Sequence, residues 1–121
     1  MSNFEFRFDE EQGVLHCKAN GFFTVEEVQA FGVAMRHHAD TARRAHGYCR
    51  LLIDSSDGVV QSNEVIEEFA RFPPMIQRPG DKKAVVVSSS LAKVQARRTF
   101  HSDREQAFVS MAAATAWLMA D

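Results

Sequence analysis

The N-terminal part of the chain alternates apolar and polar residues in two short runs. Residues 4–8, with the sequence FEFRF, place a phenylalanine at every second position. That period of two is typical of a strand with one face in water. A second run at 14–19 follows a polar turn at 9–13 that ends in glycine. The pattern therefore predicts an antiparallel hairpin.

A helical period replaces this alternation after residue 24. Apolar residues recur three or four positions apart between Val28 and Ala42. Thr24 and Glu27 have the spacing of a capping box, in which each side chain accepts a hydrogen bond from the other residue's backbone N–H. Gly47, directly after a basic segment, is a typical C-terminal signal. Together these features predict a helix at about 25–45.

The remainder of the chain alternates short apolar runs with helical segments. Residues 49–54 are typical of a central strand buried on both faces. A second helix begins at Ser62 or Asn63 and is broken or kinked at Pro73-Pro74. Its apolar face is formed by Val65, Ile66, Phe69 and Phe72. The last predicted elements are a strand at 84–87, a helix at about 91–101 behind a run of serines, a strand at 107–109 and an alanine-rich helix capped by Ser110.

The predicted order of elements is β-β-α-β-α-β-α-β-α. A helix that joins two strands of one sheet makes them parallel, and such crossovers are right-handed. We therefore expect an α/β fold with a mixed, mostly parallel sheet of about five strands, an antiparallel edge hairpin and four helices. No repeat, linker or low-complexity tract interrupts the pattern, so residues 1–121 are expected to form a single domain.

Charge and composition narrow the classes of function. The chain has 14 basic and 16 acidic residues and a net charge of −2, without the basic excess that is typical of nucleic-acid-binding proteins. No apolar run approaches the roughly 18 residues of a membrane-spanning helix. The first residues carry no secretory signal, so we expect a cytoplasmic protein. Cys17 and Cys49 are expected to be buried free thiols rather than a disulfide.

This order of elements, with its spacing, resembles the STAS domain of anti-sigma-factor antagonists and sulfate-transporter tails. Within that fold the chain is similar to small stand-alone bacterial proteins that are grouped with lipid-binding Sec14 domains. The segments that carry the resemblance are residues 21–27, 51–54, 84–87, 108–110 and 116–118. The resemblance implies a regulatory domain that acts through contacts with a protein partner such as a kinase or another regulator.

The resemblance also implies a phosphorylated serine at the start of the second helix, in a motif close to Asp-Ser-Ser-Gly. Those letters are matched by the loop that contains Asp54, Ser55, Ser56 and Asp57. The loop, however, directly follows the strand, whereas the family's serine lies at the helix start. The position that corresponds to the family's serine is Ser62, which is also suited to be the N-cap of that helix.

Asp54, Ser55, Ser56, Asp57 and Asn63 also form a candidate interaction or ligand loop. They follow the carboxyl end of a central parallel strand, where open α/β sheets place their ligands. The two carboxylates can bind a cation or act as acid and base with a nearby histidine. A solvated loop at the strand end is the alternative.

Two further groups of residues are candidates for a binding role. Ser89 and Ser90 precede a helix that carries Lys93 and Arg97, and a helix start can hold a phosphate or an anionic headgroup. The alternative for these residues is a capped helix with a solvated basic face. The second group, which can line a pocket for a fatty or isoprenoid chain or simply fill the core, consists of Phe69, Phe72, Met75 and Ile76.

The sequence has no motif typical of a hydrolase, a nucleotide-binding loop or a metal site. His37 and His38 are adjacent and would point about 100° apart on a helix, which does not suit one metal ion. We therefore expect no catalytic residues, no metal and no cofactor. Three functions stay open: a non-enzymatic interaction domain, alone or as a homodimer; a carrier of a lipid or another apolar small molecule; and a small enzyme that uses Asp54 or Asp57.

Overall fold

A computed structural model of the 121-residue chain describes residues 3–72 and 77–120. It has one five-stranded mixed sheet with the strand order β1-β2-β3-β4-β5. β1 is antiparallel to β2, and the other neighbouring strands are parallel. The strands are β1 (Phe4–Asp9), β2 (Val14–Ala19), β3 (Arg50–Ser55), β4 (Lys82–Val87) and β5 (Glu105–Phe108). The described helices are α1 (Val25–His46), α2 (Asn63–Phe69), α4 (Ser90–Arg97) and α5 (Met111–Met119). The predicted α/β class, with its antiparallel edge hairpin, is confirmed.

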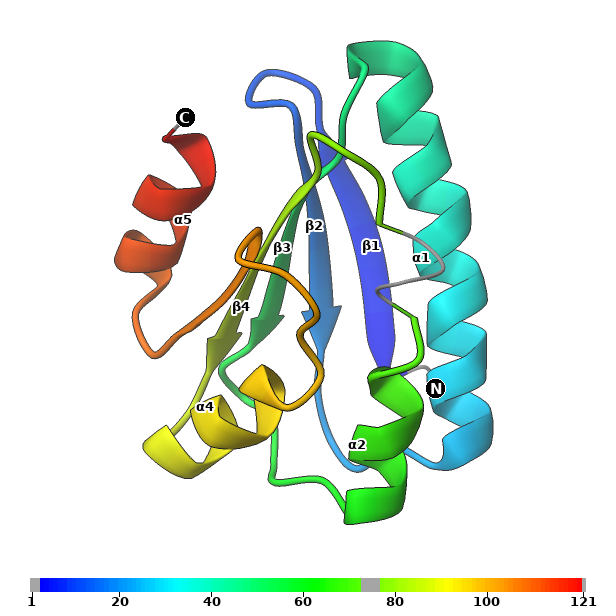
Figure 1. Ribbon diagram of the computed structural model, residues 1–121, viewed down its shortest axis with the longest axis vertical. Coiled ribbons are helices and arrows are strands. Elements are labelled where there is room, and N and C mark those ends of the chain that lie inside the picture. The colour runs from blue at the N-terminus through cyan, green and yellow to red at the C-terminus, as the bar shows by residue number, and fades with distance from the viewer. Residues whose placement is uncertain (1–2, 73–76, 121) are drawn as a thin grey trace.

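The helices cover the two faces of the sheet unequally (Figure 1). α1, α2 and α4 each join two parallel strands that lie side by side, and right-handed crossovers in one direction place them on the same face. α5 follows the last strand and packs on the opposite face, against β3, β4 and β5. Lys82 holds the end of α5, because its ammonium donates to the backbone oxygens of Trp117 and Ala120.

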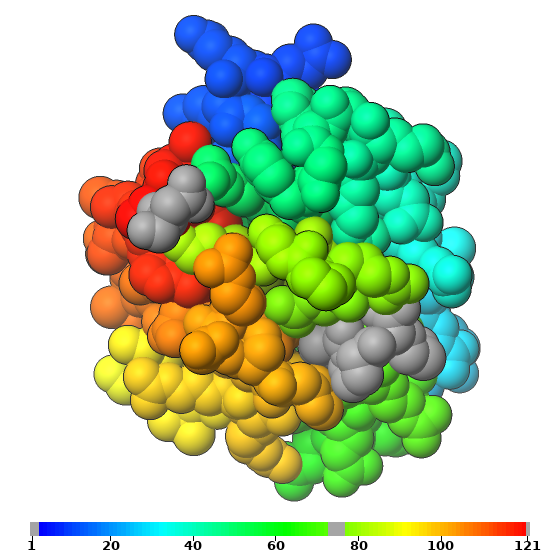
Figure 2. Space-filling view, turned by 45° about the horizontal axis from the view of Figure 1, so that its top comes forward, coloured from blue at the N-terminus to red at the C-terminus, as the bar shows by residue number. Residues whose placement is uncertain are grey.

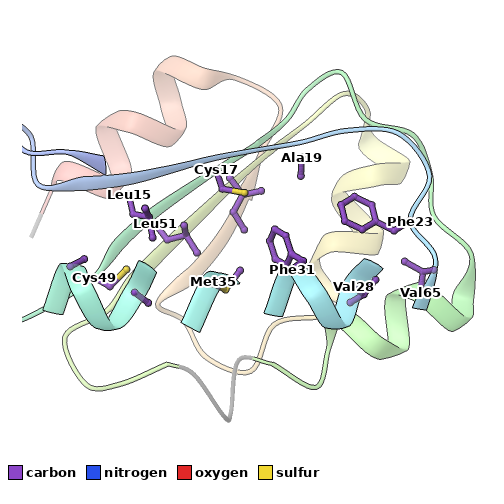
Figure 3. Packing of buried hydrophobic residues seen from close by; sticks show 13 residues of the cluster. Leu15, Cys17, Ala19, Phe23, Val28, Phe31, Met35, Cys49, Leu51 and Val65 are labelled. Carbon is purple, nitrogen blue, oxygen red and sulfur yellow. The ribbon is translucent and has the colours of Figure 1, made fainter. Parts of the chain in front are cut away.

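The core is built by alternate residues of the central strands. Leu51 and Ile53 belong to the cluster beneath α1, whereas Leu52 between them belongs to the cluster beneath α5. Phe31 and Met35 rise from α1 towards the sheet, and Leu51 points back at them (Figure 3). β3 is therefore buried on both faces, as predicted from its unbroken apolar run.

α1 begins and ends at the predicted signals. The backbone N–H of Glu27 donates to the Thr24 hydroxyl at 3.1 Å, and the Thr24 N–H donates to the Glu27 carboxylate at 2.9 Å. This reciprocal pair is the predicted capping box. Gly47 ends the helix in the left-handed region, with φ of 82°, where glycine carries no steric penalty.

Two helices are shorter than the prediction. α2 ends at Phe69, so Phe72 lies beyond it, and α4 ends at Arg97 instead of near residue 101. After each helix the backbone N–H groups bond three residues back, which is a tight 3₁₀-type turn, although the apolar period of the sequence continues. Pro73 and Pro74, where the second helix was expected to break, lie outside the described residues.

The last two strands also differ from the prediction in their bounds. Each begins two residues early, at Lys82 and at Glu105, and β5 ends before Val109. The early starts extend the parallel ladder, in which Lys83 is the partner of Glu105. Charged residues were assigned to the preceding loops because a buried strand normally carries apolar side chains.

Cys17 and Cys49 are free and buried, as predicted. Burial raises the pKa of each thiol to about 12, so both stay protonated near neutral pH and are poor nucleophiles. Among the described residues, no helix has the length and apolar character needed to cross a membrane.

Candidate functional site

A cavity of about 170 Å³ lies between the sheet and the three helices α1, α2 and α4. Its floor is formed by β3 and β4, through Leu51, Ile53 and Val85. Its roof is α4, a helix with no buried residue, which turns only Ala92, Gln95 and Ala96 towards the cavity.

Aromatic rings form the wall between α1 and α2. Phe31 lies with its ring centroid 6.2 Å from that of Phe23 and 5.6 Å from that of Phe69, both in edge-to-face contact. Phe72 continues this wall and sits over Gly32 of α1, where a Cβ atom would meet the ring at 2.4 Å. Each such ring pair contributes about 0.5–1.5 kcal/mol to stability beyond its area burial. These contacts therefore hold the rings of the wall in place.

A buried ion pair closes part of the amino end of the cavity. The ammonium Nζ of Lys83 lies 2.9 Å from Oε1 of Glu105, whose side chain is completely buried. The other carboxylate oxygen, Oε2, accepts hydrogen bonds from the backbone N–H groups of His101 at 2.7 Å and Ser102 at 3.1 Å. Burial lowers the pKa of Lys83, and the adjacent Glu105 carboxylate opposes that shift.

A second charged pair stands at the same end of the cavity. Asp81 accepts from the Arg43 guanidinium, from the Cys49 N–H at 2.9 Å and from the Arg78 N–H at 2.8 Å. The Arg104 guanidinium donates to the backbone oxygen of Asp81 at 3.0 Å. This bond ties the segment before β4 to the segment before β5, and the two lie side by side on the surface in Figure 2.

Two glutamines close the carboxyl end. The Gln61 N–H donates to the Gln95 side chain at 3.0 Å, and the Gln95 amide donates back to the Gln61 oxygen at 2.9 Å. The Gln61 side chain also accepts from the Phe23 N–H at 3.0 Å and donates to the Gly21 oxygen at 2.9 Å. These bonds join α4 to the loops before α1 and α2, so the cavity is held by polar contacts at both ends.

The cavity contains part of the predicted apolar group. Phe69 and Phe72 are among its lining residues, whereas Met75 and Ile76 lie outside the described residues. Ser62 is placed elsewhere, as the exposed N-cap of α2, where its hydroxyl accepts from the Val65 N–H at 3.3 Å.

The polar loop after β3 is a turn that holds its shape with its own hydrogen bonds and also contacts β2. Asp54 accepts from the Ser56 N–H at 3.0 Å, and the Gly58 N–H donates to the Ser55 oxygen at 2.8 Å. Asp57 makes an exposed ion pair with Lys18 of β2, at 3.9 Å.

The two carboxylates of this loop stand apart from the cavity. Ser55 is among the described lining residues, but neither Asp54 nor Asp57 is. Asn63 accepts from Arg98 at 3.4 Å at the start of α2. No group of three potential metal ligands occurs among the described residues.

The serines before α4 act as its cap. The Ser89 hydroxyl accepts from the Ala92 N–H at 3.1 Å, and Ser90 is the first helical residue. Lys93 meets Ser89 through its backbone N–H, which donates to the Ser89 oxygen at 3.0 Å in the first turn of the helix. Within the described part of the chain, neither the Lys93 ammonium nor the Arg97 guanidinium bonds to these serines. The structure therefore does not bring the four residues together around a common point.

The polar residues of the cavity were missed by the sequence reasoning. Lys83 precedes Val85 and Val87 at alternate positions, which places all three on one face of β4. This alternation could have indicated that Lys83 is buried and needs a partner, because a charged side chain on a buried strand face is costly unless it is paired. Nothing local in the sequence indicates that the partner is Glu105 or that Gln61 meets Gln95.

Neither a protein-family model, nor a curated protein, nor a solved structure matches this chain.

Proposed function

We propose that this chain is a non-enzymatic binding domain that holds a small apolar molecule in the cavity beneath α4. The observation that carries the proposal is this apolar hollow of about 170 Å³, roofed by a helix without a buried residue. An apolar cavity of about 150 Å³ in another protein stays dry and binds benzene. The cavity therefore has room for one ring or a short chain, or for such a part of a larger lipid.

The size of the cavity argues against an incidental packing defect. Protein interiors are close-packed, and voids larger than a water molecule are few. A ligand that fills the hollow removes apolar surface from water, which contributes about 25 cal/mol for each Å² buried and favours its uptake.

The test is an NMR titration of the ¹⁵N-labelled protein with toluene. We expect saturable shifts of the amide signals of Leu51, Val85 and Ala96, which surround the cavity. The Ala96→Leu variant fills the space from the α4 side, so it should lose the response and unfold at a higher temperature. Ala112→Leu makes the same change at an exposed position of α5 and should bind toluene normally.

Two results would contradict the proposal. Wild-type signals that do not respond to toluene would show that the cavity does not take up an apolar ring. An equal response in wild type and Ala96→Leu would place the bound ring elsewhere.

A second candidate function is contact with a protein partner, as the STAS resemblance implies. The observation that favours it is a set of exposed apolar side chains at the carboxyl edge of the sheet. Phe22 is 72% exposed and Leu91 is 61% exposed. Val59, Val60 and Val94 belong to the same set, and the bonds of Gln61 hold their segments together. Exposed apolar patches of this kind often mark interaction sites.

Phosphorylation of Ser62 would fit this second function. Ser62 is exposed at the same edge, two residues after Val60. A phosphate adds roughly −1.5 to −2 charges, so it would weaken the docking of an apolar partner surface.

Two test variants and one control variant test the contact role. Phe22→Ser with Val94→Ser should abolish the capture of a native partner, and Ser62→Glu should weaken it. Val33→Ser changes an even more exposed valine, on α1 and away from this edge, and should leave the capture intact. Equal capture by all variants would exclude the carboxyl edge as the contact surface.

A further inference from the structure

Lys83 places a polar side chain on the floor of the otherwise apolar cavity. Lys83, Val85 and Val87 follow one another at alternate positions of β4, and all three line the cavity. The Lys83 side chain is 16% exposed, whereas the side chain of its partner Glu105 is completely buried. A molecule in the cavity can therefore reach the lysine but not the carboxylate.

The contacts of the Lys83 ammonium leave hydrogen-bonding capacity for a ligand. Within the described residues, the ammonium lies 2.9 Å from Oε1 of Glu105 and 5.3 Å from the centroid of the Phe100 ring. An ammonium carries three protons, and these two contacts occupy at most two of them. A ligand that excludes water from the cavity has to give the remaining N–H an acceptor, because a buried donor without one is costly.

From this arrangement, and resting on the proposed binding function, we propose that the cavity selects an apolar molecule that carries a ketone or ester carbonyl group. The carbonyl oxygen accepts a hydrogen bond from Nζ of Lys83. The apolar body of the molecule lies against the rest of the floor, which is formed by Leu51, Ile53 and Val85. A carbonyl suits this point because it accepts a hydrogen bond and has no proton of its own to place.

Two other head groups fit the same point less well. A hydroxyl accepts from Lys83, but it also buries a proton that Oε1 of Glu105 cannot take, because this oxygen is closed off from the cavity. A ligand carboxylate would share Lys83 with Glu105. One ammonium cannot neutralise two carboxylates, and an uncompensated buried charge is costly.

The experiment compares dissociation constants for cyclopentane, cyclopentanone and cyclopentanol, which share one ring and differ in the head group. NMR titration of the ¹⁵N-labelled protein, followed at the Val85 amide, measures all three. In wild type we expect the ketone to bind at least about tenfold more tightly than the alcohol, as one unsatisfied buried donor implies.

The double variant Lys83→Met with Glu105→Gln removes both charges without leaving either unpaired. The new amide oxygen can still accept from the N–H groups of His101 and Ser102. In this protein the affinity of the ketone relative to cyclopentane should fall about tenfold. Lys93→Met changes a lysine of α4 outside the described lining and should keep the wild-type ratio.

A second measurement needs no variant. A hydrogen bond weakens the carbonyl bond, so the C=O stretching band of cyclopentanone bound to wild type should lie at lower frequency than in hexane. A band at the hexane position would show that the carbonyl oxygen has no donor and would overturn the inference.

The outcomes separate this inference from the proposed function. If toluene binds but cyclopentanol binds wild type as tightly as cyclopentanone, the carbonyl selectivity alone is overturned. The same holds if the double variant keeps the wild-type ratio of ketone to cyclopentane. Toluene that fails to bind would overturn the apolar-ligand function, and this inference with it.

Discussion

At the residue scale, Asp81 connects the segment before β4 to Arg43 in α1 and to Cys49 before β3, which lie 38 and 32 residues earlier in the chain. Its carboxylate accepts from Arg43 in α1, from the Cys49 N–H before β3 and from the Arg78 N–H before β4. The Asp81 side chain is 7% exposed, so these bonds lie in a medium of low polarity. Asp81 therefore fixes the amino end of the cavity.

Replacing Asp81 should be strongly destabilising. Asp81→Ala removes the acceptor of two backbone N–H groups and one of the two carboxylates of Arg43, which keeps Asp40 at 2.8 Å. Leaving buried donors unsatisfied costs about 1–3 kcal/mol. We expect a loss of about that size in the free energy of unfolding, measured with urea. Asp103→Ala, at an exposed position, should change it by less than about 0.5 kcal/mol. Equal effects of the two substitutions would contradict this role of Asp81.

His16 makes the stability depend on pH. Burial, reinforced by Arg7, holds the pKa of His16 below 6.5, and Asp9 opposes the shift. The folded chain thus binds this proton more weakly than the unfolded chain. The contribution of His16 to stability is complete above about pH 6.5 and is lost as the pH falls through that value towards the folded pKa.

His16→Gln should therefore lose less stability than wild type when the pH falls from about 7.5 to about 5. Urea unfolding at both pH values measures the difference. The lowered pKa of His38 affects both proteins alike and cancels in the comparison. Identical pH dependence of wild type and variant would show that His16 is not involved.

At the element scale, both ends of α1 are set by caps that can be predicted from the sequence. Thr24, Glu27 and Gly47 act through neighbours in the chain, so local spacing was enough to predict both ends of the helix. The ends of α2 and α4 were predicted poorly for the opposite reason. Each helix tightens into a turn whose course depends on contacts with other segments, such as the bond of His101 to the Ala70 oxygen at 2.7 Å.

The capping box of α1 gives a matched pair of substitutions. Thr24→Ala removes the hydroxyl that accepts from the Glu27 N–H and should lower the free energy of unfolding by about 1 kcal/mol. Thr41→Ala makes the same change inside α1, where the exposed hydroxyl bonds to the His37 oxygen at 3.0 Å, and should be neutral or slightly stabilising. Urea unfolding of both variants measures the difference between their stability losses. Equal losses would show that the cap is unimportant.

The contact between α1 and the segment after α2 should reverse the usual effect of a glycine-to-alanine substitution on stability. Alanine normally stabilises a helix by about 0.5–1 kcal/mol relative to glycine. Gly32→Ala should instead destabilise the wild-type chain, because its Cβ would meet the Phe72 ring at 2.4 Å. In the Phe72→Ala background the same substitution should become stabilising. A gain of the same size in both backgrounds would contradict the contact.

At the scale of the whole molecule, the sequence predicted the sheet and its order of elements but not the cavity. Alternation and helical periods are local, and the right-handed crossover rule converts their order into a topology. A cavity forms between segments that are far apart in the sequence, so no local pattern predicts it. This cavity is lined by Ala92 and Ala96 of α4 together with Val85 of β4, and nothing local in the chain indicates that these residues line one space.

Candidate sites that act within one turn could be anticipated from the sequence, whereas sites that join distant segments could not. Ser62 and Ser89 were predicted as caps because a cap acts within its own turn. The pair of Lys83 and Glu105 depends on the register between β4 and β5. That these two residues pair is therefore apparent only in the folded chain.

The most direct test of the central claim is the free energy of unfolding with and without toluene. A ligand at about 100 times its dissociation constant, bound to the folded chain alone, stabilises it by about 2.7 kcal/mol. We predict this gain for wild type and no gain for Ala96→Leu, in which the cavity is filled. Toluene that leaves the unfolding free energy of wild type unchanged, or that raises that of both proteins equally, would contradict a binding function for the cavity beneath α4.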